Sequence, residues 1–245
     1  MFLGVFTAAT WQWSHPVRRV RTSRIAQKTY AVHMVVRGES RPAAGPENGP
    51  AVFRSAAEGM RAATFRPEVL AEEMPAPQRI APYAAALSAD VTVGDVDVAT
   101  GRLILLHDPE GNDAWGTVHA APGTFRLVAY ARADIDVEHI SDPLLGEVGW
   151  SWLLDALSAH GASHVAAAGT VTRVATESYG GMAEEEGTAQ IEIRASWTPV
   201  GADSGELDVR PHTEAWGELL CTAAGLPPVP EGVTVMPSRR GQRGA

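Results

Sequence analysis

Residues 83–106, YAAALSADVTVGDVDVATGRLILL, contain two strand patterns in succession with no helix between them. In residues 83–93 apolar side chains occupy the odd positions and polar ones interrupt the even positions, which predicts a strand with one buried face. A turn predicted at 95–101 leads into the apolar run 103–106, which is short enough for a buried strand. Consecutive strands without crossover helices favour an antiparallel or mixed sheet with helices on one face.

Further strands and three helices are predicted on either side of this stretch. Alternating side chains predict strands at 124–132, 163–177 and 188–197, and His107–Gly111 has the composition of a turn. Helical spacing of apolar residues predicts helices at 51–63, 143–160 and 210–224; for the second, Asp142 is the expected cap and Gly161 the expected end. The sequence therefore predicts an α+β fold, a single domain with a largely antiparallel sheet of about six strands and three helices packed on it. The predicted order is helix, four strands, helix, two strands, helix.

The two ends of the chain differ in composition from this domain. Residues 38–50 are rich in Pro and Gly, and residues 1–33 carry five basic residues and no acidic one. We expect residues 1–50 to be a disordered or mis-annotated N-terminal extension and linker, 51–226 the domain, and 227–245 a flexible tail. Three explanations of the basic start are open: translation that begins at Met34, a nucleic-acid-binding arm, or a genuine disordered segment.

Charge and composition exclude several classes of function. The whole chain carries −9, and because residues 1–33 contribute +5, the remainder carries −14. Such a domain is a poor match for nucleic acid, since Lys and Arg supply most of the affinity for phosphate backbones. No apolar run reaches the ~18 residues of a membrane helix. The single Cys221 excludes an internal disulfide, which favours a cytoplasmic location.

The sequence contains no coherent set of catalytic or metal-binding residues. His107 and Asp108 are expected in a turn, and Gly161 interrupts the helical spacing of His160 and His164, so neither pair predicts a metal site. His212 and Cys221 could form a Cys–His site, but their places on an apolar helix face favour structural roles. No phosphate-binding loop or nucleophile elbow is present. We expect no cofactor and no metal, name no catalytic residue, and expect the acidic stretch 184–186 to be a solvated loop.

Tryptophans are the candidate interface residues. The helix at 143–160 has two apolar stripes, one through Trp150 and another through Trp152, and the helix at 210–224 adds Trp216. Trp residues are enriched in interfaces as well as in cores. Trp150, Trp152 and Trp216 therefore form either part of the core or a surface for a partner protein or a second copy of the chain.

Several segments in order resemble the uncharacterised bacterial family called domain of unknown function 3000, over about residues 53–237. The resemblance lies in 75–83 (PAPQRIAPY), 99–109 (ATGRLILLHDP), 142–152 (DPLLGEVGWSW), 169–181 (GTVTRVATESYGG), 194–197 (RASW) and 214–221 (EAWGELLC). It implies a bacterial, cytoplasmic protein, and it implies no activity and no catalytic residues. Against the family pattern, Thr117–Pro122 is an insertion, which predicts a longer hairpin loop.

Two functions fit these observations. The leading hypothesis is a non-catalytic protein-binding or regulatory module, because no nucleophile, base and electrophile come together. The alternative is a small-molecule enzyme or ligand-binding protein that uses polar residues on one face of the sheet. The candidate residues for that face are Arg79, Tyr83, His107, Arg126, Arg173, Glu177 and Tyr179.

Overall fold

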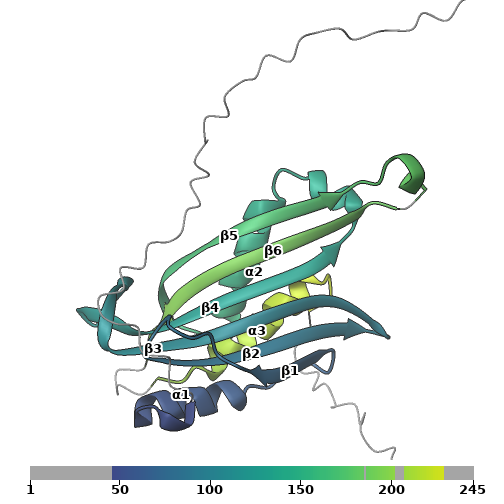
Figure 1. Cartoon of the computed structure of the whole chain (residues 1–245). Coiled ribbons are helices and arrows are strands. Elements are labelled where there is room, and N and C mark those ends of the chain that lie inside the picture. Colours follow the sequence, from purple (N-terminus) through teal and green to yellow (C-terminus); the bar gives the residue numbers. More distant parts are fainter. Residues whose placement is uncertain (1–45, 185, 202–206, 229–245) are drawn as a thin grey trace, which may run out of the picture. The chain divides into compact units, whose positions relative to one another are not determined.

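A computed structural model of the protein describes residues 46–184, 186–201 and 207–228. Residues 1–45 and 229–245, which hold most of the predicted extension and tail, lie outside them, as does Glu185 of the predicted acidic loop. The described residues form a six-stranded antiparallel sheet with three α-helices on one face (Figure 1), which confirms the predicted α+β fold.

The sheet has the strand order β1-β2-β3-β4-β6-β5, so β1 and β5 are its edges. The strands are β1 (Val69–Met74), β2 (Tyr83–Val93), β3 (Val96–Val118), β4 (Ala121–Ile135), β5 (His164–Thr176) and β6 (Thr188–Pro199). The α-helices are α1 (Ala51–Arg61), α2 (Leu145–Ala159) and α3 (Arg210–Ala223). Short 3-10 turns are η1 (Pro46–Asn48), η2 (Val137–Ser141) and η3 (Gly180–Met182). In this part of the chain no helix is long and apolar enough to span a membrane.

The turn predicted at His107–Gly111 is wrong, because β3 continues through it. The β3–β4 register shifts between His107 and Asn112 and again between Asn112 and Thr117. Pro109 lies within the first register shift. Because residues in such a shift are not paired in the ladder, a proline, which has no backbone N–H to donate, is tolerated there. The predicted insertion Thr117–Pro122 lies at the tip of this hairpin, around a two-residue turn.

The helix predicted at 143–160 begins two residues later, at Leu145. Asp142 Oδ1 accepts a hydrogen bond from the backbone N–H of Leu144 at 2.8 Å, so it closes a turn before the helix instead of capping it. At the other end Gly161 has a φ of +64°, and the N–H of Ala162 donates to the carbonyl of Leu157 at 2.8 Å. The predicted end of this helix at glycine is therefore confirmed.

The main core lies between the sheet and the helices, and α3 is the middle helix of the layer. The helix α3 contacts both α1 and α2, and the strands β3 and β4 lie beneath it. Phe53, Ala56, Ala57 and Met60 of α1 are buried at the predicted helical spacing. The structure thus places α3 between α1 and α2.

A small second cluster covers one end of the opposite face of the sheet. Trp115, from the long arm of β3, is 4% exposed and packs with Ala84 and Leu106. The arm is tied to the sheet by Thr198, whose hydroxyl donates to the carbonyl of Trp115 and accepts a hydrogen bond from Arg126 Nη1 at 3.0 Å. The rest of this face carries mostly polar side chains.

Candidate functional site

The histidine and cysteine of α3 are core residues that lie far apart. His212 and Cys221 are nine residues apart, which is about 13 Å along a helix. Burial raises the pKa of the Cys221 thiol to about 12, so it is not a thiolate at neutral pH. Burial lowers the pKa of His212 to about 4, and its neutral Nδ1 accepts a hydrogen bond from Trp197 Nε1 at 3.1 Å. These two residues form no nucleophile–base pair.

His107 is buried among aromatic rings, and its ring makes no hydrogen bond with Asp108. Its Nδ1–H donates to the carbonyl of Thr124 at 2.9 Å, and its ring stacks on Phe125 with centroids 4.2 Å apart. Nε2 is buried and has no hydrogen-bond partner among the described residues. Asp108 instead accepts a hydrogen bond from the backbone N–H of Glu110 at 3.1 Å. Burial lowers the pKa of His107, so the ring is neutral at neutral pH.

The other predicted metal candidates do not form a binding site. His160 Nδ1 lies 3.9 Å from Glu214 Oε2, whereas His164 Nδ1 lies 3.0 Å from the carbonyl of Ala162. Glu214 Oε1 also accepts hydrogen bonds from the backbone and hydroxyl of Thr64. Within the described residues, no three His, Cys, Asp or Glu side chains are grouped so that they could hold a metal ion.

The polar residues proposed to share one sheet face are scattered. Tyr83 and His107 face the helices and lie in an aromatic cluster. Arg126 lies on the opposite face, 7% exposed, and its Nη atoms donate to Thr198, Ser196 and the carbonyl of Ala166. The remaining members lie elsewhere: Arg173 donates to the carbonyl of Asp142, Tyr179 donates to Glu177 beyond the end of β5, and Arg79 is in the 75–82 connection.

The three candidate tryptophans occupy different environments. Trp216 is 0% exposed, and its Nε1–H donates to the carbonyl of Tyr130 at 3.3 Å, so it presents no surface to a partner. Trp150 and Trp152 are half-buried and pack against the core. For the interface hypothesis this leaves α2 and the residue before it, because Leu144, just before α2, and Val148 of α2 are 58% and 41% exposed.

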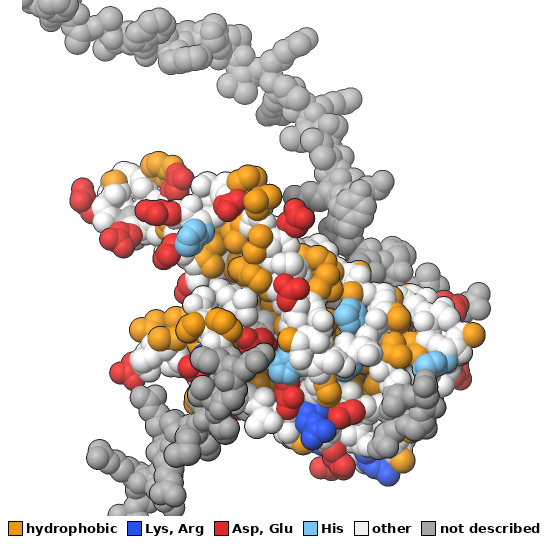
Figure 2. All heavy atoms as spheres, turned by 180° about the vertical axis from the view of Figure 1, so that it is seen from behind, with side chains coloured by type: hydrophobic (Ala, Val, Ile, Leu, Met, Phe, Trp, Pro, Cys, Tyr) orange, Lys and Arg blue, Asp and Glu red, His pale blue; other side chains and the backbone are white. Residues whose placement is uncertain are grey.

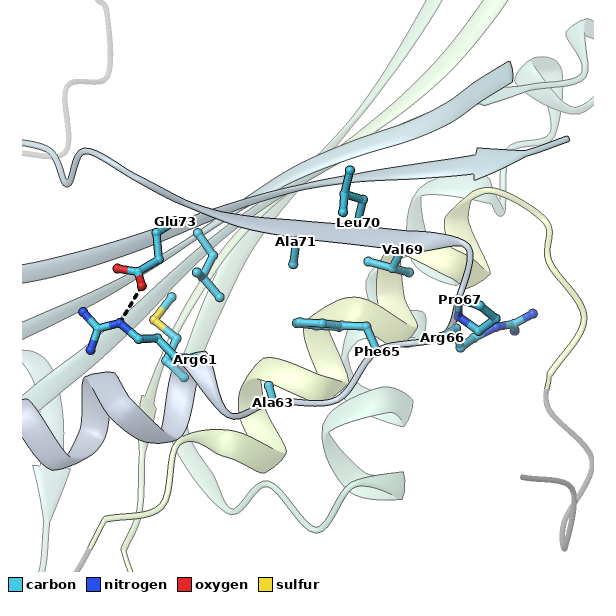
Figure 3. Close-up of a pocket in the computed structure, with 11 residues that line it drawn as sticks. Arg61, Ala63, Phe65, Arg66, Pro67, Val69, Leu70, Ala71 and Glu73 are labelled. Carbon is cyan, nitrogen blue, oxygen red and sulfur yellow. Dashed lines mark hydrogen bonds and ion pairs between the residues drawn. The ribbon is translucent and has the colours of Figure 1, made fainter. Parts of the chain in front are cut away.

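A pocket of about 550 Å³ lies beside the edge strand β1 (Figure 3). The end of α1 and the connection to β1 form one wall, and β1 and β2 form the other. Its lining consists of Met60, Arg61, Ala63, Phe65, Arg66, Pro67, Val69, Leu70, Ala71, Glu73 and Leu87. Figure 3 shows the Ala71 side chain on the Phe65 side of the strand and Leu70 on the other side. The pocket is therefore on the helical side of the sheet edge.

The charged residues of the pocket are already paired, which leaves apolar walls between them. Arg61 Nε lies 2.7 Å from Glu73 Oε1 at one end. At the other end Arg66 Nη2 lies 3.1 Å from Glu68 Oε1, and this hydrogen bond lowers the pKa of Glu68. The pocket thus presents polar surface at its ends and apolar surface between them, where one apolar side chain of a ligand could lie.

The outer backbone of β1 faces the same space. The N–H of Thr92 donates to the carbonyl of Glu68 at 2.9 Å, and the register from Val69↔Val91 to Met74↔Ala86 contains no shift. In an antiparallel ladder every second residue bonds inward, so the N–H and C=O groups of Ala71 and Glu73 point away from β2. An edge of this kind can pair with another extended chain.

Sequence reasoning missed this site because β1 was not located as a separate strand. Val69, Ala71 and Glu73 alternate with Leu70 and Glu72, and prolines flank the segment at 67 and 75. An alternation of only six residues is a weak strand signal. The position of β1 at the edge of the sheet depends on strand order, which the structure shows.

Comparison with known proteins gives one result. A family model described as "Protein of unknown function (DUF3000)" matches residues 49–234. No curated protein and no solved structure matches the chain. Because the family model covers well over half of the 245 residues, the chain belongs to the DUF3000 family.

Proposed function

We propose that the protein is a non-catalytic module of the bacterial cytoplasm that binds an extended segment of a partner protein along β1. The observation that carries this proposal is the outward-facing backbone of Ala71 and Glu73 beside a pocket that offers both charged and apolar side chains. Strand addition combines both features, because main-chain hydrogen bonds supply affinity and pockets for alternate side chains supply specificity. We do not expect nucleic acid as a partner, since the chain carries −9.

Two kinds of contact would contribute free energy to such binding. Each backbone hydrogen bond contributes about 0.5–1.5 kcal/mol net. Burial of one Leu- or Phe-sized side chain contributes about 1.5–3 kcal/mol. Nothing in β1 itself blocks pairing, because Val69–Met74 contains no proline.

The pocket volume also supports the second candidate, a small-molecule ligand. Its 550 Å³ falls within the roughly 300–1,000 Å³ typical of ligand sites. The lining contains no histidine, cysteine, serine or threonine, and Glu73 is paired with Arg61, so the pocket supports binding rather than catalysis.

A substitution at Ala71 tests strand addition. Ala71→Pro removes the outward-facing N–H of residue 71 but breaks no hydrogen bond to β2. Ala71→Ser keeps that N–H and serves as the matched control. Peptides selected from a random library on the wild-type protein are expected to bind Ala71→Ser normally and Ala71→Pro at least about tenfold more weakly, a change of about 1.4 kcal/mol. Circular dichroism and urea unfolding of each variant check that the fold is retained.

Hydrogen exchange distinguishes the alternatives. Under strand addition, the amides of Ala71 and Glu73 become protected when the peptide binds. A small molecule or a peptide held only by its side chains leaves these amides unprotected. A second copy on β1 gives a dimer by sedimentation that Ala71→Pro dissociates. Unchanged exchange at both amides, or equal peptide affinity of the two variants, would refute the proposal.

A further inference from the structure

The described residues leave much of the sheet face opposite the helices uncovered. In Figure 1 the strands lie in front of α2 and α3, and none of the described helices crosses the front of the sheet. The cluster around Trp115 covers one end of this face. Elsewhere the register of the strands decides which polar side chains are neighbours.

Three arginines, Arg102, Arg132 and Arg194, lie in neighbouring register positions of the open face, on the adjacent strands β3, β4 and β6. Arg102 is the register partner of Tyr130, and Tyr130 is the register partner of Arg194. Arg132 lies two residues beyond Tyr130 on β4 and therefore on the same face. Since Thr100 is the partner of Arg132, Arg102 and Arg132 are diagonal neighbours, with Cβ atoms about 7–8 Å apart or less.

Arg194 and Tyr130 form an ordered platform. Arg194 Nη2 lies 2.8 Å from Glu192 Oε2, and its guanidinium carbon lies 5.4 Å from the centroid of the Tyr130 ring. The Tyr130 hydroxyl donates to Glu192 Oε1 at 3.3 Å. Burial raises the pKa of Tyr130, so the phenol keeps this proton. The arrangement pairs Arg194 with Glu192 and places its guanidinium over the Tyr130 ring.

Arg102 and Arg132 are not neutralised in this way. Among the described residues, no carboxylate lies within 4.0 Å of either guanidinium. Neighbouring like charges on adjacent strands destabilise a sheet. The helical face, seen in Figure 2, shows acidic side chains over a wide area and basic ones in a small part of it. Glu192 is the register partner of Arg132, but its carboxylate pairs with Arg194. Arg102 and Arg132 thus lie together without an ion pair on the other face of the sheet, where a bound anion would stabilise them.

We infer that this face binds an extended acidic segment of a protein, with two of its carboxylates on Arg102 and Arg132. Carboxylates at alternate positions of an extended chain lie about 7 Å apart, twice the rise of about 3.3 Å per residue, and this spacing matches the diagonal pair. The Tyr130–Arg194 platform lies beside the pair and supports the backbone of the segment. This site is separate from the β1 edge, so it stands whether or not β1 binds a peptide.

The surrounding charges favour a short acidic segment over nucleic acid. Glu72, Asp90 and Asp134 are exposed on the same face, in the register rows of the arginines or next to them. A nucleic-acid strand carries a negative charge at every nucleotide and would bring several phosphates near these carboxylates. A segment with only two carboxylates brings fewer negative charges near them.

Binding of defined probes to the full chain tests the inference. The probes are a short labelled peptide with glutamate at two alternate positions, its glutamine counterpart and a thymidine oligonucleotide of similar length, measured by fluorescence anisotropy at low ionic strength. We expect the glutamate peptide to bind, and Arg102→Gln and Arg132→Gln each to weaken it about tenfold, as loss of a charge-assisted pair does. Arg210→Gln on α3 makes the same change in charge away from this face and leaves the affinity unchanged.

Two further measurements complete the test. Arg132→Lys keeps the charge and is expected to retain most of the affinity. Because repulsion is relieved, Arg102→Gln is expected to be at least as stable to urea as the wild type. No binding of the glutamate peptide, equal binding of the glutamine peptide, tighter binding of the oligonucleotide, or equal losses with Arg210→Gln would each overturn the inference.

Discussion

Lowering the pH from 7 to 5 is expected to destabilise this protein through His212 before its carboxylates are largely protonated. His212 is 2% exposed and accepts a hydrogen bond from Trp197, and burial lowers its pKa from 6.5 to about 4. His164 also lowers this pKa, whereas Asp208 raises it. The folded chain therefore takes up the proton less readily than the unfolded chain, and stability falls as pH falls below 6.5.

The magnitude follows from the two pKa values. At pH 5 the unfolded histidine is almost fully protonated and the folded one is mostly neutral, which lowers the free energy of unfolding by about 2 kcal/mol relative to pH 7. Below pH 4 the loss levels off at about 3 kcal/mol, because each pKa unit corresponds to about 1.36 kcal/mol. His107 adds a loss of the same sign, since burial lowers its pKa as well.

Urea unfolding at pH 7 and pH 5 measures this contribution. His212→Gln retains an acceptor for Trp197 but cannot titrate, so its loss between the two pH values is expected to be smaller than the wild-type loss by about 2 kcal/mol. The exposed His139 provides the matched control, and His139→Gln is expected to lose as much as the wild type. Equal losses in His212→Gln and the wild type would refute the assignment of the acid-sensitive group.

Three further outcomes are expected. Cys221, whose pKa burial raises to about 12, should react with a thiol reagent at pH 8 only after unfolding, and rapid reaction of the native protein would contradict its buried position. Gly169→Ala should lower the free energy of unfolding by about 1–3 kcal/mol, because the new Cβ would lie 2.3 Å from the carbonyl oxygen of Arg194; unchanged urea unfolding would show that β5 shifts freely. Trp150 packs over Gly169, so Trp150→Glu should lower the thermal midpoint by several degrees. A Trp150→Glu variant of wild-type stability that had lost an oligomer or a captured partner would make Trp150 an interface residue.

The sequence by itself determined the elements whose burial repeats locally. The spacing of Phe53, Ala56, Ala57 and Met60 predicted α1, and these four residues are buried. The alternation of Ile191, Ile193 and Trp197 with polar residues predicted β6, and these three lie against the helices. Such patterns can be recognised in the sequence because the period of a helix or strand fixes which side chains share a face, whatever that face contacts in the folded protein.

Only the tertiary structure decided which faces and edges were left uncovered. Trp216 is core because α3 lies between α1 and α2, and no pattern within α3 states its neighbours. β1 offers a pocket because strand order makes it an edge. Arg102 and Arg132, thirty positions apart in the sequence, are neighbours only through the β3–β4 register. Both candidate binding sites thus depend on strand order and register, which pairings between distant segments set and local periodicity does not.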